Sequence, residues 1–317
     1  MTGEFDFIAS LRALATSEAA RGLLDDAAVL ETPAGTLVIT HDMVAEGVHY
    51  RADDPPEDVA WKLVAVNLSD LAGKGARPLG VLLGYSLGQS DWDRAFVAGL
   101  ATALGAFALP LLGGDTIALP GGAPRVLGLT AVGTADGPVP SRSGARPGDR
   151  IWVSGTIGDA GAGLSLLEAG RSEPAGLVER YRNPRPRLEA GQRLALLVSA
   201  MMDVSDGLLI DAARMAEASG CRAEVALDAV PLSEERLAFA GGDRAARLDA
   251  AIAGDDYELL FAAPAEASTR ILGIGEEIGL PLTPIGAFAE GKGLALTDSG
   301  EAVALSGRLG YEHRRGD

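Results

Sequence analysis

The stretch "DPPEDVAWKLVAVNLSDLAGKGA", Asp54 to Ala76, predicts the long helix around which we expect this fold to be built. Asp54, Pro55 and Glu57 are typical of a helix start, where a cap residue, a first-turn proline and the acid of a capping box occur together. The apolar residues that follow recur at helical spacing. We therefore predict a helix over residues 55–73.

This helix would carry two polar residues on its apolar face. At 100° per residue, Val59, Leu63 and Val66 lie on one side of the helix, and Asn67 and Asp70 fall near the centre of that side. A buried carboxylate costs several kcal/mol unless it is paired or binds a metal ion. The simpler explanation is an Asn67–Asp70 pair that caps a neighbouring loop, and the alternative is a metal ligand.

Segments with the patterns of strands and helices alternate along the whole chain, which predicts a mixed α/β fold. The stretch "DGPVPSRSGARPGD", residues 136–149, has the composition of a linker, and 317 residues suggest two domains. We place the domains at 1–138 and 139–317. The expected strands cover 36–40, 79–87, 125–133, 149–155, 221–227 and 257–263, further helices cover 91–107 and begin near residue 160, and a hairpin turns at 298–300.

Charge and composition exclude several classes of protein. With 27 basic and 44 acidic residues the net charge is −17, so we expect no nucleic-acid partner and no anionic membrane surface. The uncharged segment 95–114 could span a bilayer by length alone. Pro110 interrupts it, so a buried helix followed by a short strand is the better prediction. One cysteine and an acidic start, "MTGEFDFIASL", without a secretory signal favour a cytoplasmic location.

Acidic residues recur at the ends of the expected strands and helices. Taken one at a time, each is better explained by a turn or a helix cap. Together they form a set of hard oxygen ligands, and clustered carboxylates need cations to coexist. Oxygen-only ligand sets favour Mg²⁺ or Ca²⁺ over zinc. The acids of this set are Asp25, Asp26, Asp42, Asp70, Asp115, Asp159, Asp203, Asp206, Asp255 and Asp256.

Eight motifs in order resemble those of the thiamine-monophosphate kinase family. The wider superfamily includes aminoimidazole-ribonucleotide synthetase, selenophosphate synthetase and the hydrogenase-maturation dehydratase, and "EGVHY", "DVSDGL" and "GDDYELLF" point to the kinases within it. The motifs are "LDDAAVL" (24–30), "THDMVAEGVHY" (40–50), "NLSDLAGKGARP" (67–78), "GGDT" (113–116), "SRSGARPGD" (141–149), "SGTIGDAGAGL" (154–164), "DVSDGL" (203–208) and "GDDYELLF" (254–261).

The resemblance implies a two-domain aminoimidazole-ribonucleotide-synthetase-like fold, with an N-terminal mixed sheet that forms a homodimer and a C-terminal α/β domain. It also implies that ATP, thiamine monophosphate and several Mg²⁺ ions bind in the acid-lined groove. The matching positions are Asp26, Thr40, His41, Asp42, Asp70, Asp115, Asp203 and Asp206 for metal, Gly114, Asp115, Arg142 and Ser205 for ATP, and His49, Asp255 and Tyr311 for the substrate.

The chain departs from the family pattern at four positions. Leu24 stands where the family has glycine, His41 where it has threonine or serine, and Asp255 where it has the longer glutamate. Lys74 stands where methionine is common, and we expect it on the surface. These departures bear on the turn before Asp25, on one metal contact and on the reach of one substrate contact.

The chemistry that the resemblance implies is transfer of the γ-phosphoryl group of ATP directly to thiamine monophosphate. Its acceptor is a phosphate monoester with a second pKa of about 6, already ionised at pH 7, so we assign no general base and no covalent nucleophile. Two alternatives remain open. One is a sister ATP-dependent enzyme that acts on another small substrate, and the other is a non-catalytic dimer that binds divalent metal.

Overall fold

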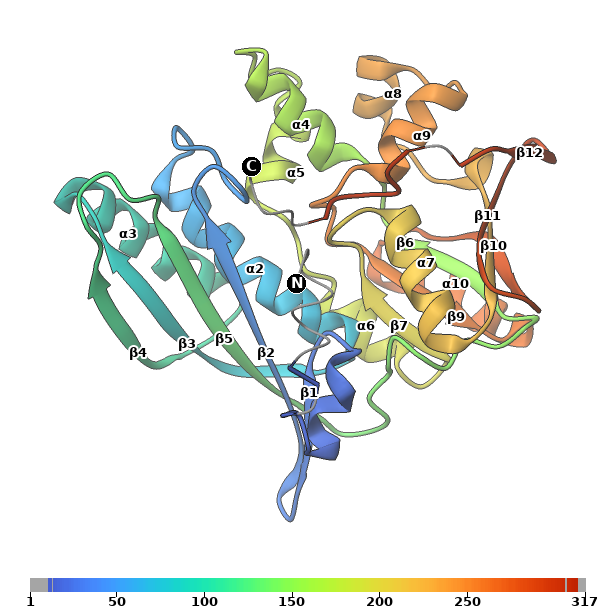
Figure 1. Ribbon diagram of the computed structural model, residues 1–317, viewed down its shortest axis with the longest axis horizontal. Helices are drawn as coiled ribbons and strands as arrows, with labels where there is room; N and C mark the ends of the chain where they lie inside the picture. The colour runs from blue at the N-terminus through green and yellow to red at the C-terminus, as the bar shows by residue number, and fades with distance from the viewer. Residues whose placement is uncertain (1–10, 13, 306, 313–317) are drawn as a thin grey trace.

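A computed structural model describes residues 11–12, 14–305 and 307–312 of the chain. It contains two mixed sheets, a five-stranded sheet in the order β1-β2-β5-β3-β4 and a seven-stranded sheet in the order β12-β11-β8-β10-β6-β9-β7. The two sheets form separate halves that lie side by side (Figure 1). The expected mixed α/β fold is confirmed, and the segment between β5 and β6 connects the halves, although the boundary at 138/139 stays a prediction.

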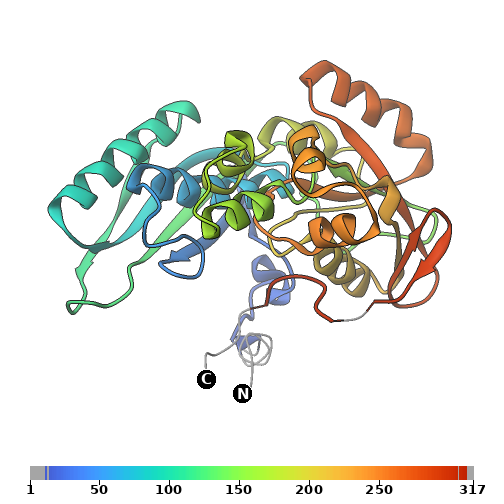
Figure 2. The same cartoon turned by 90° about the horizontal axis from the view of Figure 1, so that it is seen from above.

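The N-terminal half consists of one sheet with helices on one of its faces (Figures 1 and 2). The long helix α2 has 14 of its 18 residues buried, including Asn67 and Asp70. The opposite face of the sheet is open, and every residue of the edge strand β4 is exposed. The elements are η1 (Glu18–Leu23), β1 (Ala28–Thr32), β2 (Gly35–Ala45), α2 (Pro56–Gly73), β3 (Arg77–Leu87), α3 (Ser90–Ala106), β4 (Leu111–Ala118) and β5 (Val126–Ala135).

The C-terminal half surrounds the seven-stranded sheet with short helices. Its elements are β6 (Arg150–Ser154), α4 (Asp159–Glu168), α5 (Ala175–Arg182), α6 (Leu188–Leu194), β7 (Ala200–Asp203), α7 (Leu208–Ser219), β8 (Arg222–Ala226), η2 (Leu227–Ala229), α8 (Glu234–Ala240), α9 (Arg244–Ile252), β9 (Leu259–Ala263), η3 (Ala265–Ala267), α10 (Ser268–Ile278), β10 (Leu282–Ala289), β11 (Gly293–Asp298) and β12 (Glu301–Val303). The predicted hairpin is the β11–β12 pair, which turns at Ser299 and Gly300.

The predicted helix cap at Asp54 is wrong. Pro55 stands at the cap position of α2 without a side-chain hydrogen bond. The Asp54 carboxylate instead accepts hydrogen bonds from Arg182 Nε at 3.0 Å and from the Tyr181 hydroxyl at 3.2 Å, both in the C-terminal half. The Asp54 carboxylate, which the local sequence pattern predicted to cap α2, is therefore bound by Arg182 of another element instead.

The apolar segment 95–114 forms part of α3, a turn and part of β4, so the expected helix and strand are confirmed. The expected burial of the helix is wrong, because only Phe96, Gly99, Leu100 and Ala103 of α3 are buried. In the described part of the chain no helix combines the length and the apolar character needed to cross a membrane.

The two halves meet along α2, which has one face on its own sheet and the other against the C-terminal half. Trp61 Nε1 donates a hydrogen bond to the Pro184 carbonyl at 2.9 Å. At the far end of α2, a Cβ added to Gly73 would come within 3.2 Å of the backbone of Met202 and Asp203, so glycine allows β7 to lie directly on the helix. This packing brings Asp70 of α2 and Asp203 of β7 into one region.

Candidate active site

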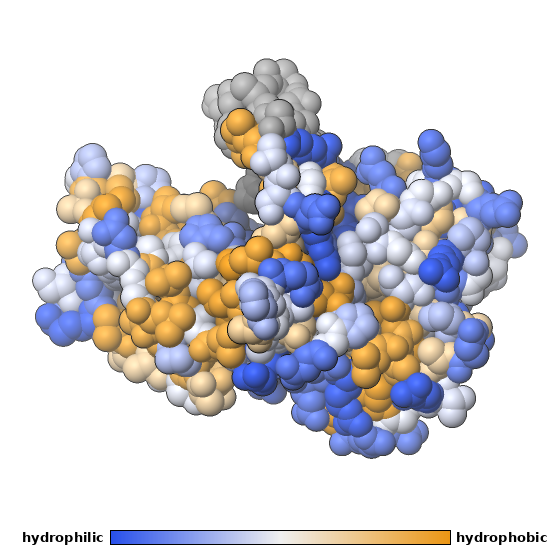
Figure 3. Space-filling view, turned by 90° about the horizontal axis from the view of Figure 1, so that it is seen from below, coloured by the Kyte–Doolittle hydropathy of each residue, from blue (hydrophilic) through white to orange (hydrophobic). Residues whose placement is uncertain are grey.

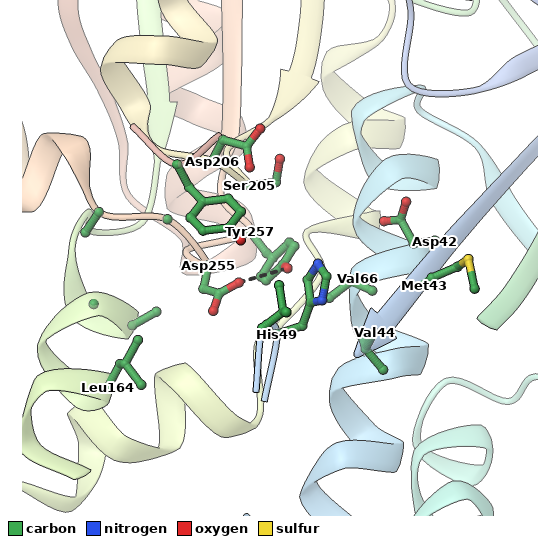
Figure 4. Close-up of a pocket in the computed structure, with 16 residues that line it drawn as sticks. Asp42, Met43, Val44, His49, Val66, Leu164, Ser205, Asp206, Asp255 and Tyr257 are labelled. Atoms are coloured by element: carbon green, nitrogen blue, oxygen red, sulfur yellow. Dashed lines mark hydrogen bonds between the residues drawn. The ribbon is translucent and has the colours of Figure 1, made fainter. Parts of the chain in front are cut away.

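A pocket of about 710 Å³ opens between the two halves. Asp42, Met43 and Val44 reach it from β2 on one side, and Ser205, Asp206 and Asp255 from two C-terminal loops on the other, with His49 between them (Figure 4). The wall includes residues from each predicted set: Asp42 and Asp206 from the metal set, Ser205 from the nucleotide set, and His49, Asp255 and Tyr311 from the substrate set. The remaining residues of the wall are Val48, Val66, Ala160, Gly161, Leu164, Ala253, Gly254 and Tyr257.

Asp42, Asp70 and Asp203 form a group of carboxylates at this junction, and no cationic side chain among the described residues pairs with them. Burial, and then the neighbouring Asp26, raise the pKa of Asp203 to about 8. Burial and the charges of Asp26 and Asp206 raise the pKa of Asp42 to about 6. Burial, followed by Asp42 and Asp203, raises the pKa of Asp70 well above its usual range. These carboxylates repel one another, which is the electrostatic signature of a site that needs added cations.

Two neutral groups hold part of this cluster in place. The Thr40 hydroxyl donates a hydrogen bond to Asp70 Oδ2, and Asn67 Oδ1 accepts one from the Asp42 backbone N–H at 2.9 Å. Asn67 also donates to the Leu63 carbonyl of its own helix at 2.9 Å. The alternative of an Asn67–Asp70 pair is therefore wrong, because each residue binds a different part of β2. Thr40 and Asn67 thereby link β2 to α2 at the positions of Asp42 and Asp70.

The pair Asp25 and Asp26 differs from that group because cations surround it. Lys74 Nζ lies 2.6 Å from one oxygen of each carboxylate, and Arg142 Nη2 donates to Asp26 Oδ1. Burial opposes ionisation of both acids, but Lys74 and Arg142 outweigh it and lower the pKa of Asp26. The Lys74–Asp26 contact lacks hydrogen-bond geometry, so Asp26 Oδ2 is a buried oxygen without a hydrogen-bond donor. Because the buried Lys74 ammonium stands beside that oxygen, a metal ion would take Asp26 Oδ1, from which the partly exposed Arg142 can move away.

The expectation that Lys74 is a surface residue is wrong, because its side chain is fully buried. A lysine near the end of α2 gave no sign of burial in the sequence. The burial arises from the turn that carries Asp25 and Asp26, which covers the end of α2 only in the folded chain.

The loop "DVSDG" is stabilised by Asp211, an acid that was not predicted to belong to the site. The backbone N–H groups of Ser205 and Asp206 both donate to Asp211 Oδ2 at 3.2 Å. Burial raises the pKa of Asp211 to about 7, although Arg214 opposes the shift. Asp206 itself pairs with Arg214, and its carbonyl accepts a hydrogen bond from the Tyr311 backbone N–H at 2.8 Å. An acid in the first turn of the following helix was the available signal for this role.

Asp255, a predicted substrate contact, lies in the wall of the pocket. Its backbone N–H donates to the Ser205 carbonyl at 2.8 Å, and its φ of 69° is unusual for a residue other than glycine. Its carboxylate is held from both sides, by Lys62 Nζ at 2.8 Å and by the Tyr257 hydroxyl at 3.1 Å. Lys62 also donates to the His49 carbonyl at 2.8 Å. Lys62 was not predicted, because nothing in the sequence relates α2 to a loop nearly 200 residues later. Tyr257 was not predicted either, although it lies in the motif "GDDYELLF" two residues after Asp255.

Three predicted site residues, His41, Gly114 and Asp115, do not lie near the cluster of Asp42, Asp70 and Asp203 within one chain. In the sheet register Asp42 stands opposite Leu129, Leu129 opposite Leu83, and Leu83 opposite Gly114. Gly114 is therefore three strand spacings, about 14 Å, from Asp42. Side chains alternate along strands, so Asp115 and His41 point to the open face of the sheet, where the His41 ring lies 2.9 Å from Thr130 Oγ1. Their predicted roles stay predictions that a single chain does not support.

The residues at this junction fit Mg²⁺ by their chemistry. All the grouped donors are oxygens, as a hard divalent cation prefers. The uncompensated charge on the three buried carboxylates Asp42, Asp70 and Asp203 calls for a cation. Among the described residues, no three acidic, histidine or cysteine side chains are already close enough together to enclose an ion. The acids would need side-chain rotations to coordinate one.

Comparison with known proteins identifies the relatives of this chain. The profile of the AIR synthase related protein N-terminal domain matches residues 24–135, and that of the C-terminal domain matches residues 146–299. A thiamine-monophosphate kinase of Caulobacter vibrioides is 41% identical, over 98% of this chain and 90% of that protein. The corresponding kinase of Escherichia coli K12 is 37% identical, over 92% of this chain and 91% of that protein.

A solved structure shares the whole architecture. AaThiL complexed with AMPPCP and TMP superposes with a TM-score of 0.84 at 30% identity, covering 98% of this chain and 97% of that one. A thiamine-monophosphate kinase from Stenotrophomonas maltophilia K279a superposes with a TM-score of 0.78 at 38% identity, covering 94% and 96%. The two-domain arrangement around the pocket is thus common to this chain and to both structures.

Proposed function

The chain belongs to the AIR synthase related family and, within it, to the thiamine-monophosphate kinases, and from this we propose that it makes thiamine diphosphate from thiamine monophosphate and ATP. In the proposed reaction a phosphate oxygen of thiamine monophosphate attacks the γ-phosphorus of ATP in line with the bond to the β–γ bridging oxygen. That bond breaks, ADP leaves, and no phosphoryl-enzyme forms.

One observation carries the proposal beyond the family name. The uncompensated carboxylates Asp42, Asp70 and Asp203 stand beside the pocket between the halves, and the held carboxylate of Asp255 forms another part of its wall. An acid-rich wall would repel ATP and thiamine monophosphate unless cations bound there. A pocket of this kind supports a reaction between two anions that depends on divalent metal.

In the proposed mechanism the protein positions charge rather than moving protons. Asp42, Asp70 and Asp203, together with Asp26 and Asp206, would hold Mg²⁺, and Thr40 orients Asp70 among them. When bound, Mg²⁺ would neutralise the phosphates of ATP and the charge that develops during transfer. The acceptor phosphate is already ionised near pH 7, so no side chain needs to act as general base.

The predicted nucleotide and substrate contacts meet in the wall of the pocket, where Ser205 lies beside Asp255. Ser205 and Arg142 would contact the ATP phosphates. The Arg142 side chain is 23% exposed and could turn from Asp26 toward a phosphate. His49, between the two halves, Asp255, beside Ser205, and the half-exposed Tyr311 would contact thiamine monophosphate. The Asp255 carboxylate and the Tyr311 ring suit the cationic thiazolium.

The proposal includes a homodimer formed through the open face of the five-stranded sheet. Exposed apolar side chains lie on this sheet, among them Met43, Leu82, Leu112 and Ile117, each at least 40% exposed. Hydrophobic side chains are also prominent on this half, at the left of the view from below in Figure 3. Burying such a surface between two copies is the simplest way to remove it from water. His41 and Asp115 share that face, which would place them at the interface.

A substrate panel tests the proposal against the sister activities of the same fold. ATP consumption is measured with Mg²⁺ and either thiamine monophosphate, thiamine, an aminoimidazole-ribonucleotide precursor or selenide. Consumption that depends on thiamine monophosphate alone, with ADP as the nucleotide product, supports the kinase, and consumption with another substrate supports a sister enzyme. The location proposed is the cytoplasm, where ATP is available, and cell fractionation tests it.

A further inference from the structure

We propose that Lys74 is a resident cation of the acid cluster, which takes the place of one divalent metal ion at Asp25 and Asp26. The inference rests on the metal site of the proposed function, but not on the phosphoryl transfer itself. It concerns how many metal ions this chain binds.

The first ground is the set of atoms around the ammonium group. Lys74 Nζ donates hydrogen bonds to Asp25 Oδ1 at 2.6 Å and to the Met201 carbonyl at 3.2 Å, and it lies 2.6 Å from Asp26 Oδ2. Two carboxylate oxygens and one carbonyl oxygen are the hard ligands that a divalent ion also takes. The ammonium thus occupies the space between two acids where a metal ion would otherwise bridge them.

The second ground is burial. Three cationic side chains contact this acid pair, and those of Arg21 and Arg142 are 22% and 23% exposed, whereas that of Lys74 has no exposure. Arg142 can leave Asp26 when a phosphate arrives. Lys74 is enclosed between the end of α2, the turn at 25–26 and β7, and the carbonyls at the end of a helix favour a cation there. Its charge is therefore a permanent part of the site.

The third ground is the contrast between the two groups of acids. Asp25 has no unused oxygen, because Arg21, Lys74 and the Arg142 backbone N–H all donate to it. Asp26 has one oxygen beside Lys74 Nζ and the other held by the partly exposed Arg142, and Asp42, Asp70 and Asp203 form no ion pair with any described residue. Lys74 thereby removes Asp25 from the metal ligands and leaves Asp26 as a terminal one. Mg²⁺ would then bind mainly at Asp42, Asp70 and Asp203.

The test counts metal ions and does not depend on turnover. Mn²⁺ binding is measured by equilibrium dialysis on the full chain with a non-hydrolysable ATP analogue, for the wild type, Lys74→Met, Asp25→Asn and the double variant. We expect Lys74→Met to bind one more Mn²⁺ per chain than the wild type. Its metal-free Tm should fall by about 5 to 10 °C, because two buried carboxylates lose their cation, and Mn²⁺ should restore it.

Asp25→Asn provides the second arm of the test. It keeps Lys74 and leaves this lysine the Asp26 carboxylate as a partner, so we expect it to fold. We expect it to bind as many Mn²⁺ ions as the wild type, and the double variant to do the same. Equal counts in the wild type and Lys74→Met, or the loss of an ion in Asp25→Asn, would overturn the inference. If Lys74→Met does not fold, the count for Asp25→Asn decides. A wild type that binds no Mn²⁺ would instead overturn the metal site of the proposed function.

Discussion

Lys62 and Asp255, 193 residues apart in the chain, form an ion pair at 2.8 Å that joins α2 to a loop in the wall of the pocket. Lys62 also lies 4.1 Å from the centre of the Tyr181 ring and donates to the His49 carbonyl. One buried ammonium thus fixes two of the three residues that we assign to thiamine monophosphate, His49 and Asp255. Lys62 is a positioning residue, because it reaches the substrate only through His49 and Asp255.

We predict that Lys62→Met raises the KM for thiamine monophosphate by about tenfold or more, a loss of roughly 1.4 kcal/mol, with a smaller change in the KM for ATP. The Asp255 carboxylate would lose its charged partner and its fixed direction. Steady-state kinetics with each substrate varied measures this, and Lys292→Met, at an exposed loop lysine, is the matched control. Equal increases in both KM values would mean that Lys62 supports the fold generally.

Asp70→Asn should reduce kcat by at least about 10²-fold, because it removes one charge from the group that would hold catalytic metal. The protein should stay folded, and its metal-free Tm should not fall, because the carboxylate is buried among like charges. The control is Asp91→Asn, an acid on α3 whose side chain is 91% exposed. Near-normal turnover in folded Asp70→Asn would remove Asp70 from the site.

Stabilisation by Mg²⁺ should increase with pH. In the metal-free chain the pKa values of Asp42 and Asp203 are raised to about 6 and about 8, so the folded state holds more protons than the unfolded state between about pH 4 and 8. The contribution of these two acids to metal-free stability is therefore largest below this range and is lost as the pH rises through it. Mg²⁺ requires the deprotonated carboxylates.

The measurement is Tm with and without Mg²⁺ at pH 5 and at pH 8.5. We predict a small increase on adding Mg²⁺ at pH 5 and a larger one at pH 8.5, and Asp42→Asn should reduce the difference. An increase that does not change with pH would show that these carboxylates do not bind the ion.

Leu112→Asp should convert a dimer into monomers. Leu112 lies on the fully exposed strand β4 and is itself 58% exposed, so the substitution would place a charge on each of two facing sheets. Sedimentation velocity at micromolar concentration measures the change. Leu237→Asp, at an exposed leucine of α8 in the other half, is the control. A wild-type chain that sediments as a monomer contradicts the proposed dimer.

Local sequence predicted most of the elements because their signals were local. The α2 helix and the strands at β2, β3 and β5 followed from periodicity, and the buried acid Asp70 followed from its place on an apolar face. The strands β1, β7 and β10 were missed. The β7 strand has only four residues, and β10 contains Pro284 beside a bulge, which weakens the pattern of alternation.

The partners of charged side chains were the part that the sequence could not supply. Asp54 binds Arg182 rather than its own helix, and Lys74 is enclosed by a turn about 50 residues earlier. Such pairings depend on which elements pack against the two ends of α2. That packing is decided by the folding of the whole chain and not by local sequence. The resemblance located the motifs, but it could not show that Asp25 and Asp26 are neutralised while Asp42, Asp70 and Asp203 are not.

The most direct test of the central claim follows the label from γ-labelled ATP to thiamine monophosphate, with Mg²⁺ and with EDTA. We predict labelled thiamine diphosphate with Mg²⁺ and none with EDTA. A folded chain that binds ATP and Mg²⁺ but yields no labelled thiamine diphosphate would contradict the proposed function.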